Sequence, residues 1–235
     1  MIRTTRRDHV LIVTIDRPER RNALDHDALA GLEAALAEAH DGDTRVLALT
    51  GSQGHFCSGA DLTTVEDDEF VAALGRVLRG IREAPFPTLA VVEGFALGAG
   101  TQLAIACDLR VATAQASFGI PAGRLGLAVD TWTVERLAML AGHGPARAML
   151  LAAEVVKGDE AHRLGLVQRI GTLDEALGWA DEIAALAPLT LRAHKAALEN
   201  LPGASDAVAR AWASQDLQEG LDAFRSRRRP VFHAR

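Results

Sequence analysis

The stretch GFALGAGTQLAIACDLRVA, residues 94–112, decides the fold. It follows the strand-like run TLAVVEG (88–94), makes a glycine turn, continues as a short apolar helix and ends in a second strand-like run, DLRVAT (108–113). Glycine lets a ligand approach the main chain closely, and a helix beginning near Ala99 directs free N–H groups outward. The sequence therefore predicts a strand, a turn and a helix that together form a binding site, with the amide of Gln102 just inside the helix.

Strands and helices alternate on both sides of this stretch. Further strands are expected at 10–15 and 45–51, an amphipathic helix after NALD (22–25) and another over 67–82. This alternation indicates an α/β fold. Beyond residue 133 the pattern becomes almost wholly helical, with helices expected at 133–141, 144–152, 158–163, 173–186, 189–200 and 204–225.

Composition excludes several classes of function. The chain of 235 residues carries a net charge of −6, which argues against binding nucleic acid or an anionic membrane through overall charge. No apolar run is long enough for a membrane span or a signal peptide. The two cysteines lack the spacing of a metal site or a disulfide framework, so no metal is expected and a reducing cytoplasm is the predicted compartment.

Two glycine-bearing loops, HFCSGADL (55–62) and GFALGAGTQL (94–103), follow predicted strands. If one backbone N–H from each loop converges on a single oxygen, the pair forms an oxyanion hole that stabilises a developing negative charge. The other interpretation is that these glycines serve only backbone geometry.

An ordered set of motifs runs through the whole chain: RPERRNAL (17–24), FCSGADL (56–62), GFALGAGTQLAIACDLRVA (94–112), FGIPAGRLGLAVD (118–130), GLV (165–167) and EGLDAFRSRRRPVF (219–232). This set resembles the crotonase, or enoyl-CoA hydratase/isomerase, superfamily. The resemblance implies a spiral of ββα units over residues 1–170, with a site for a coenzyme A thioester. It also implies a helical region over 171–235 that covers CoA and joins subunits into a homotrimer or a dimer of trimers.

The resemblance also implies residue roles. The oxyanion-hole N–H groups belong to Ala60 and Ala99, and no cofactor is expected beyond CoA itself, which arrives as the thioester of the ligand. The basic run RSRRR (225–229) has two interpretations, a solvated tail or a contact with CoA phosphates through Arg228. The residues expected along the acyl-CoA are Ala23, Leu24, Ala60, Asp61, Leu62, Gln102, Ala122, Trp132 and Arg228.

The two glutamates that hydratases of this superfamily use are missing. Their positions hold Gln102 and Ala122, and neither side chain exchanges a proton near neutral pH. Hydration by the two-glutamate route is therefore not expected. Gln102 either binds a water or a ligand amide, or it makes a polar contact within the core.

One carboxylate remains at a suggestive place. Asp130, in GLAVD, matches the position where some Δ3-Δ2-enoyl-CoA isomerases of the superfamily hold a single acid-base carboxylate, and a lone, partly desolvated Asp suffices to move a double bond. The alternative is that Asp130 only caps the helix beginning near 133. Trp132 next to it either lines an acyl pocket or closes it.

These observations favour a protein of lipid or fatty-acid metabolism that binds fatty acyl-CoA without hydrating it. The alternative within the family is an enoyl-CoA isomerase using Asp130, and a third hypothesis is an interaction subunit with a vestigial site. The region 63–80 is short for the superfamily, so the acyl pocket is expected to be open to long chains.

Overall fold

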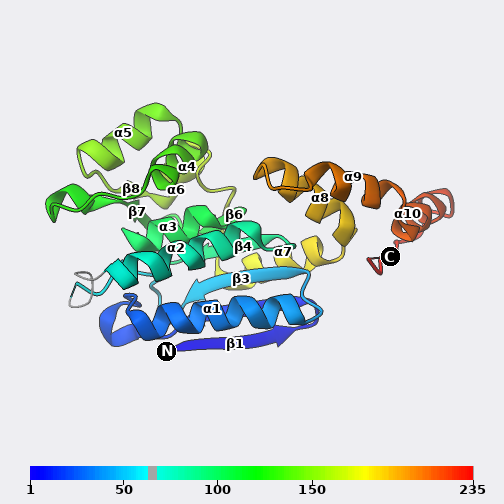
Figure 1. Cartoon of the computed structure of the whole chain (residues 1–235), viewed down its shortest axis with the longest axis horizontal. Coiled ribbons are helices and arrows are strands. Elements are labelled where there is room, and N and C mark those ends of the chain that lie inside the picture. Colours follow the sequence, from blue (N-terminus) through cyan, green and yellow to red (C-terminus); the bar gives the residue numbers. More distant parts are fainter. Residues whose placement is uncertain (63–67, 235) are drawn as a thin grey trace.

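The computed structural model describes residues 1–62 and 68–234, which fold into two sheets and a set of surrounding helices (Figure 1). The predicted cover region 63–80 lies partly outside this description, at residues 63–67. The strands are β1 (Ile2–Arg7), β2 (Val10–Ile15), β3 (Val46–Gly51), β4 (Thr88–Val92), β5 (Phe95–Leu97), β6 (Leu109–Ala112), β7 (Ser117–Gly119), β8 (Val156–Lys157) and β9 (Arg169–Ile170). The α-helices are α1 (His26–Asp41), α2 (Asp68–Glu83), α3 (Ala99–Ala106), α4 (Thr131–Ala141), α5 (His143–Leu151), α6 (Gly158–Arg163), α7 (Leu173–Ala184), α8 (Pro188–Leu198), α9 (Ala204–Trp212) and α10 (Gln215–Arg225).

The larger sheet has the order β1-β2-β3-β4-β6-β9, and all of its pairings except β1 with β2 are parallel. The four strands expected at 10–15, 45–51, 88–94 and 108–113 are β2, β3, β4 and β6. β1 was not expected, because its sequence IRTTRR has no apolar alternation and it lies almost wholly exposed at the sheet edge. It forms through its antiparallel register with β2, in which Ile2 pairs with Ile15.

Both faces of this sheet are covered, which explains the continuous apolar run of β2. Leu11 and Val13 point into a core shared with α1 and α2, whereas Val10 points into a second core shared with α7. A strand buried on both faces has no polar side to display, so its sequence is apolar without alternation.

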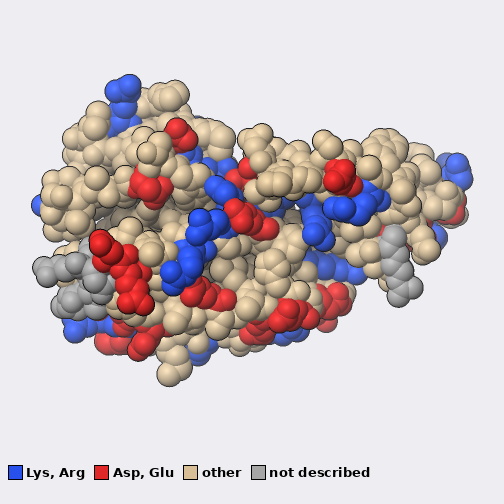
Figure 2. All heavy atoms as spheres, viewed as in Figure 1, with Lys and Arg blue, Asp and Glu red and all other residues tan. Residues whose placement is uncertain are grey.

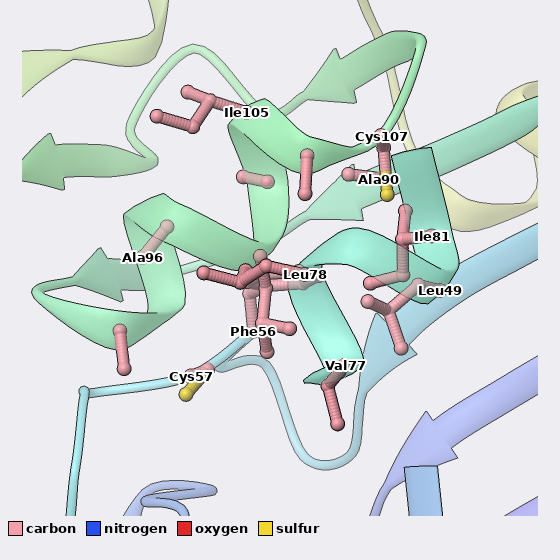
Figure 3. Close-up of a cluster of buried hydrophobic side chains, with 14 of the residues drawn as sticks. Leu49, Phe56, Cys57, Val77, Leu78, Ile81, Ala90, Ala96, Ile105 and Cys107 are labelled. Carbon is pink, nitrogen blue, oxygen red and sulfur yellow. The ribbon is translucent and has the colours of Figure 1, made fainter. Parts of the chain in front are cut away.

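The core between the sheet and the helices α2 and α3 positions the candidate site (Figure 3). Leu78 and Ile81 of α2 pack there with Phe56 from the loop after β3. Cys57 and Cys107 are free thiols in the same core, and burial raises the pKa of each to about 12. They are protonated packing groups rather than nucleophiles.

The glycine-rich segment ASFGIPAGRLGLAVD (116–130) contains β7 and then a 3-10 helix, Pro121–Arg124. β7 pairs with β5 in parallel and with β8 in antiparallel fashion, which completes the smaller sheet. These strands have only two or three residues each, too few for a periodic pattern to reveal them.

The helices α8, α9 and α10 extend away from the sheet (Figure 1). The prediction of one helix over 204–225 is wrong, because α9 ends at Trp212 and Ser214 caps a separate α10 by accepting a hydrogen bond from the Leu217 N–H at 3.2 Å. In the part of the chain that the structure describes, no helix combines the length and the apolar character needed to cross a membrane.

Candidate functional site

Two loops meet at the start of α3, where the glycine turn was predicted. The loop after β3 runs beside β5, with Cys57 bridging Ala96 and the Leu97 N–H donating to the Cys57 carbonyl at 3.0 Å. A Cβ on Gly100 would lie 2.2 Å from that carbonyl oxygen, so only glycine fits. This close approach fixes the loop against the helix. We call this contact between the loop after β3 and the start of α3 the joint.

Ala60 and Ala99 lie on the two sides of this joint. Ala60 forms a bridge with Leu24, and Ala99 is the first residue of α3, whose N–H has no partner within the helix. Within residues 1–62 and 68–234, neither N–H has an acceptor. A Cβ built on Gly59 would lie 3.9 Å from the Ala99 nitrogen, so the two loops are in contact. The loops that carry the two N–H groups are thus in contact, and the oxyanion hole itself stays a prediction.

Gln102 lies one turn further along α3 and is buried, with 6% of its surface exposed. Its amide nitrogen donates to the Thr133 hydroxyl at 2.9 Å and, more weakly, to the Asp130 carboxylate at 3.4 Å. The amide nitrogen therefore makes the polar core contact that was one of the two interpretations. Whether its oxygen also contacts a ligand stays a prediction.

Asp130 caps α4. Its carboxylate accepts from the Thr133 N–H at 2.9 Å and from the Thr133 hydroxyl at 2.9 Å. The capping interpretation is what the structure shows. Asp130 is exposed, which differs from the partly desolvated carboxylate that the isomerase alternative expected.

Thr133 was missed by sequence reasoning. It is completely buried, and its hydroxyl accepts from Gln102 and donates to Asp130. The available signal was the spacing of Asp130 and Thr133, typical of a cap and the third residue of its helix. Nothing in the sequence brings Gln102 to them, because 28 and 31 residues separate it from the two.

Trp132 lines a cavity of about 210 Å³ together with Asp130 and four residues of α2, Gly75, Leu78, Arg79 and Arg82. Trp132 was expected either to line an acyl pocket or to close it, and which of the two it does stays a prediction. The Arg82 guanidinium carbon lies 6.0 Å from the centre of the Trp132 indole, at the outer limit of a cation–π contact.

The family model for enoyl-CoA hydratase/isomerase matches residues 5–235. The protein "Probable enoyl-CoA hydratase echA6" of Mycobacterium tuberculosis is 41% identical over 99% of both chains, and a short-chain-enoyl-CoA hydratase of Clostridium acetobutylicum is 33% identical over 94% of this chain and 92% of its own. The chain belongs to the enoyl-CoA hydratase/isomerase family. An enoyl-CoA hydratase/carnithine racemase of Magnetospirillum magneticum superposes on it with a TM-score of 0.91 at 30% identity, covering 100% of this chain and 96% of the other. The fold is therefore the α/β crotonase fold predicted from the sequence.

The enoyl-CoA hydratase/isomerase family implies a CoA path beside the loop after β2. There Leu24 is fully buried, Ala23 nearly so, and Leu62 is exposed. Asp61 is held by Arg17, whose guanidinium lies 3.5 Å away and also pairs with Asp25 at 2.7 Å. Leu24 bridges Ala60 and so lies beside the loop after β3, and the contact of these residues with CoA stays a prediction.

Asn22 is a second residue that sequence reasoning missed in this loop. It is fully buried with a left-handed φ of +59°, and its amide donates to the carbonyls of Ser52 and His55. Its side-chain oxygen accepts the Arg17 N–H at 2.9 Å. Asn22 therefore ties the loop after β2 to the loop after β3.

Two of the predicted positions lie apart from the hydrogen-bonded cluster. Ala122, in the 3-10 helix Pro121–Arg124, packs against the core with only a methyl group to offer. Arg228 follows α10, a helix that lies far from α3 in Figure 1, and it pairs with Glu219 at 2.6 and 2.7 Å. Within one chain the structure does not bring Arg228 to the joint.

Proposed function

We propose that this protein binds fatty acyl-CoA thioesters at the joint between the loop after β3 and α3, without hydrating them, in fatty-acid metabolism of the cytoplasm. Membership of the enoyl-CoA hydratase/isomerase family supports the ligand class. In this proposal the thioester oxygen accepts hydrogen bonds from the N–H groups of Ala60 and Ala99, and the CoA chain runs past Ala23 and Leu24.

The observation that carries the loss of hydration is the state of Gln102. Hydration needs a group that takes a proton from water, and an amide whose nitrogen donates to Thr133 does not supply one. The second position, Ala122, has no polar side-chain atom. With neither group present, the oxyanion hole can hold and polarise a thioester but cannot complete the addition of water.

The experiment is incubation with 2-enoyl- and 3-enoyl-CoA of several chain lengths in heavy water, read by mass spectrometry, beside calorimetric titration of the same thioesters. We expect binding without a mass change. A water adduct formed by the purified protein would contradict the proposal. Gln102→Glu combined with Ala122→Glu restores both carboxylates and is expected to yield a water adduct where the unmodified chain yields none.

The alternative function, a Δ3-Δ2-enoyl-CoA isomerase, depends on Asp130. Its carboxylate accepts two hydrogen bonds from Thr133 and one from Gln102, which hold it in a fixed position at the start of α4. Deuterium uptake with a moved double bond in the same experiment would favour the alternative. Asp130→Asn should then abolish that turnover and leave binding unchanged.

We further propose that the chain assembles as a homotrimer or a dimer of trimers through α9 and α10. Trp212 is 72% exposed and Phe224 84% exposed on these helices, and an apolar groove of about 360 Å³ runs between Val208, Trp212 and Leu221. Large exposed apolar surfaces favour association. Sedimentation velocity is expected to give a multiple of three chains, and Trp212→Glu is expected to shift the distribution toward monomer.

A further inference from the structure

The cavity between α2 and α4, lined by Gly75, Leu78, Arg79, Arg82, Asp130 and Trp132, is unusual in the charge of its walls. We call it the α2–α4 groove. Two arginines face one carboxylate there, so the groove is cationic although the whole chain is acidic. Basic side chains gather over α2 in the space-filling view, with acidic side chains on either side (Figure 2).

The two arginines have unused hydrogen-bonding capacity. Arg79 is exposed and makes no ion pair within residues 1–62 and 68–234. The Nε of Arg82 is buried without an acceptor, although its Nη2 pairs with Glu83 at 2.7 Å. A buried donor without a partner is costly, so the hydrogen bonds of the Arg82 side chain are incomplete.

Asp130 does not neutralise either arginine. No ion pair within 4.0 Å joins it to Arg79 or Arg82 in the described part of the chain, because its oxygens accept instead from Thr133 and Gln102. The lining residues alone therefore keep one net positive charge; Glu83, which is not a lining residue, pairs with Arg82, and Arg79 is the arginine of the groove without an ion pair among the described residues. Its apolar walls are Leu78 and the indole of Trp132, and a Cβ built on Gly75 meets nothing within 4 Å, so the space beside Gly75 is open.

A hydrogen bond links the groove to the helix that carries part of the proposed thioester site. Asp130 lines the groove, and the Gln102 amide that reaches Asp130 comes from the helix beginning at Ala99. A volume of about 210 Å³ holds roughly seven non-hydrogen atoms at about 30 Å³ each, enough for the end of a short acyl chain. A purely apolar end would desolvate the arginines without giving them an acceptor.

We propose that the α2–α4 groove binds the far end of an acyl group that carries a carboxylate, with Arg79 and Arg82 recognising that carboxylate. This inference rests on the proposed function, and it names the class of acyl group as ω-carboxyacyl-CoA. Guanidinium groups match carboxylates in charge and in geometry, and the exposed Arg79 guanidinium has no ion pair among the described residues that would compete for a carboxylate. Leu78 and Trp132 contact the methylene groups that lead to it.

The test compares adipoyl-CoA with hexanoyl-CoA by calorimetric titration at low salt. The two acyl chains have the same number of carbons and the same CoA, so the difference in affinity isolates the terminal carboxylate. We expect adipoyl-CoA to bind at least about tenfold more tightly, and Arg79→Gln and Arg82→Gln each to reduce that ratio. The matched control is Arg76→Gln, on the same helix but paired with Glu33 at 2.6 Å outside the groove, which should leave the ratio unchanged.

Each outcome decides the proposal. If hexanoyl-CoA binds as tightly as adipoyl-CoA, the carboxylate preference is overturned while the proposed acyl-CoA function stands. If neither thioester binds, both are overturned. Should Arg82→Gln fail to fold, the exposed Arg79→Gln still gives the ratio, and Gly75→Leu, which fills the open space in the groove, is expected to weaken both thioesters.

Discussion

At the scale of single residues, substitution by proline removes the backbone N–H of Ala99 and introduces no charge. Proline is accepted at the first position of a helix. Gly98, the residue before it, has φ 52° and ψ −117°, which is the mirror image of an extended conformation and is open to glycine. We expect Ala99→Pro to weaken acyl-CoA binding by about 0.5–1.5 kcal/mol, because one hydrogen bond to the thioester oxygen is lost. Calorimetric titration measures this loss.

The control for this change is Gln215→Pro, at the first position of α10. Its cap residue Ser214 is extended, and Gln215 is exposed and distant from the joint. Affinity for acyl-CoA should not change in this variant. If Ala99→Pro binds as the unmodified chain does while its melting temperature is unchanged, the Ala99 N–H does not contact the ligand.

Asn22 carries a prediction about stability at the same scale. Asn22→Ala leaves the Ser52 and His55 carbonyls without their donor and places alanine at a left-handed φ. Unmet buried groups cost about 1–3 kcal/mol, so we expect a loss of about 2–4 kcal/mol in the free energy of unfolding, measured in urea. Asn200 also has a positive φ, but its side chain makes no hydrogen bond among the described residues, so Asn200→Ala should cost much less. Equal losses would contradict the bridging role of Asn22.

The residues of the site differ in how far sequence could find them. The turn at Gly98 and the position of Gln102 follow from local pattern, since a glycine turn and a short apolar helix are neighbours in the chain. The contact of Gln102 with Thr133 does not, because it joins two helices whose packing depends on the whole core. The meeting of Arg82 with Trp132 is of the same kind.

At the scale of elements, the hydrophobic pattern located the longer strands of the sheet interior and missed the exposed edge strand β1 and the very short strands such as β5 and β7. β2, β3, β4 and β6 are runs of apolar residues, whereas β1 is held by its register with β2 and β5 by three residue pairs with β7. The break between α9 and α10 is set by a single serine cap, which a periodic apolar seam does not reveal. Sequence therefore predicts what burial dictates and misses what backbone pairing dictates.

Helix α10 and the chain after it give a prediction for pH. Hydrogen bonds from Arg228 and from the Val231 N–H lower the pKa of Glu219 from 4.5 to about 2. A depressed pKa in the folded state means that this contribution is present above pH 4.5 and is lost as the pH falls toward 2. Glu219→Gln should mimic that loss at neutral pH and free the tail, so trypsin should release the peptide after Arg228 faster.

The matched control is Gln218→Ala on the same helix. Gln218 bonds only to Asp222, within α10, so its loss should leave the rate of tail release unchanged. The Asp216 carboxylate also holds the tail, through the N–H groups of His233 and Ala234. An unchanged rate in Glu219→Gln would therefore mean that Asp216 alone is sufficient to hold it.

At the scale of the whole molecule, one buried ammonium joins the C-terminal helices to the core. Lys195 of α8 donates to the carbonyls of Ile81 and Phe86 and pairs with Asp108 at 2.8 Å, so it ties α8 to the end of α2 and to the start of β6. Removing one partner of a buried ion pair leaves the other charge without compensation. Lys195→Met should therefore lower the free energy of unfolding by about 3–5 kcal/mol.

The same change tests how the parts of the molecule depend on one another. Because α8 connects α9 and α10 to the sheet, amides of α8 should exchange with solvent faster in Lys195→Met, whereas those of β2 and β3 should change least. Arg192→Met, an exposed position on the same helix, should shift stability by less than about 0.5 kcal/mol. If Lys195→Met instead speeds exchange equally in every element, the helices and the sheet unfold as one cooperative unit, and Lys195 stabilises that unit rather than the docking of α8.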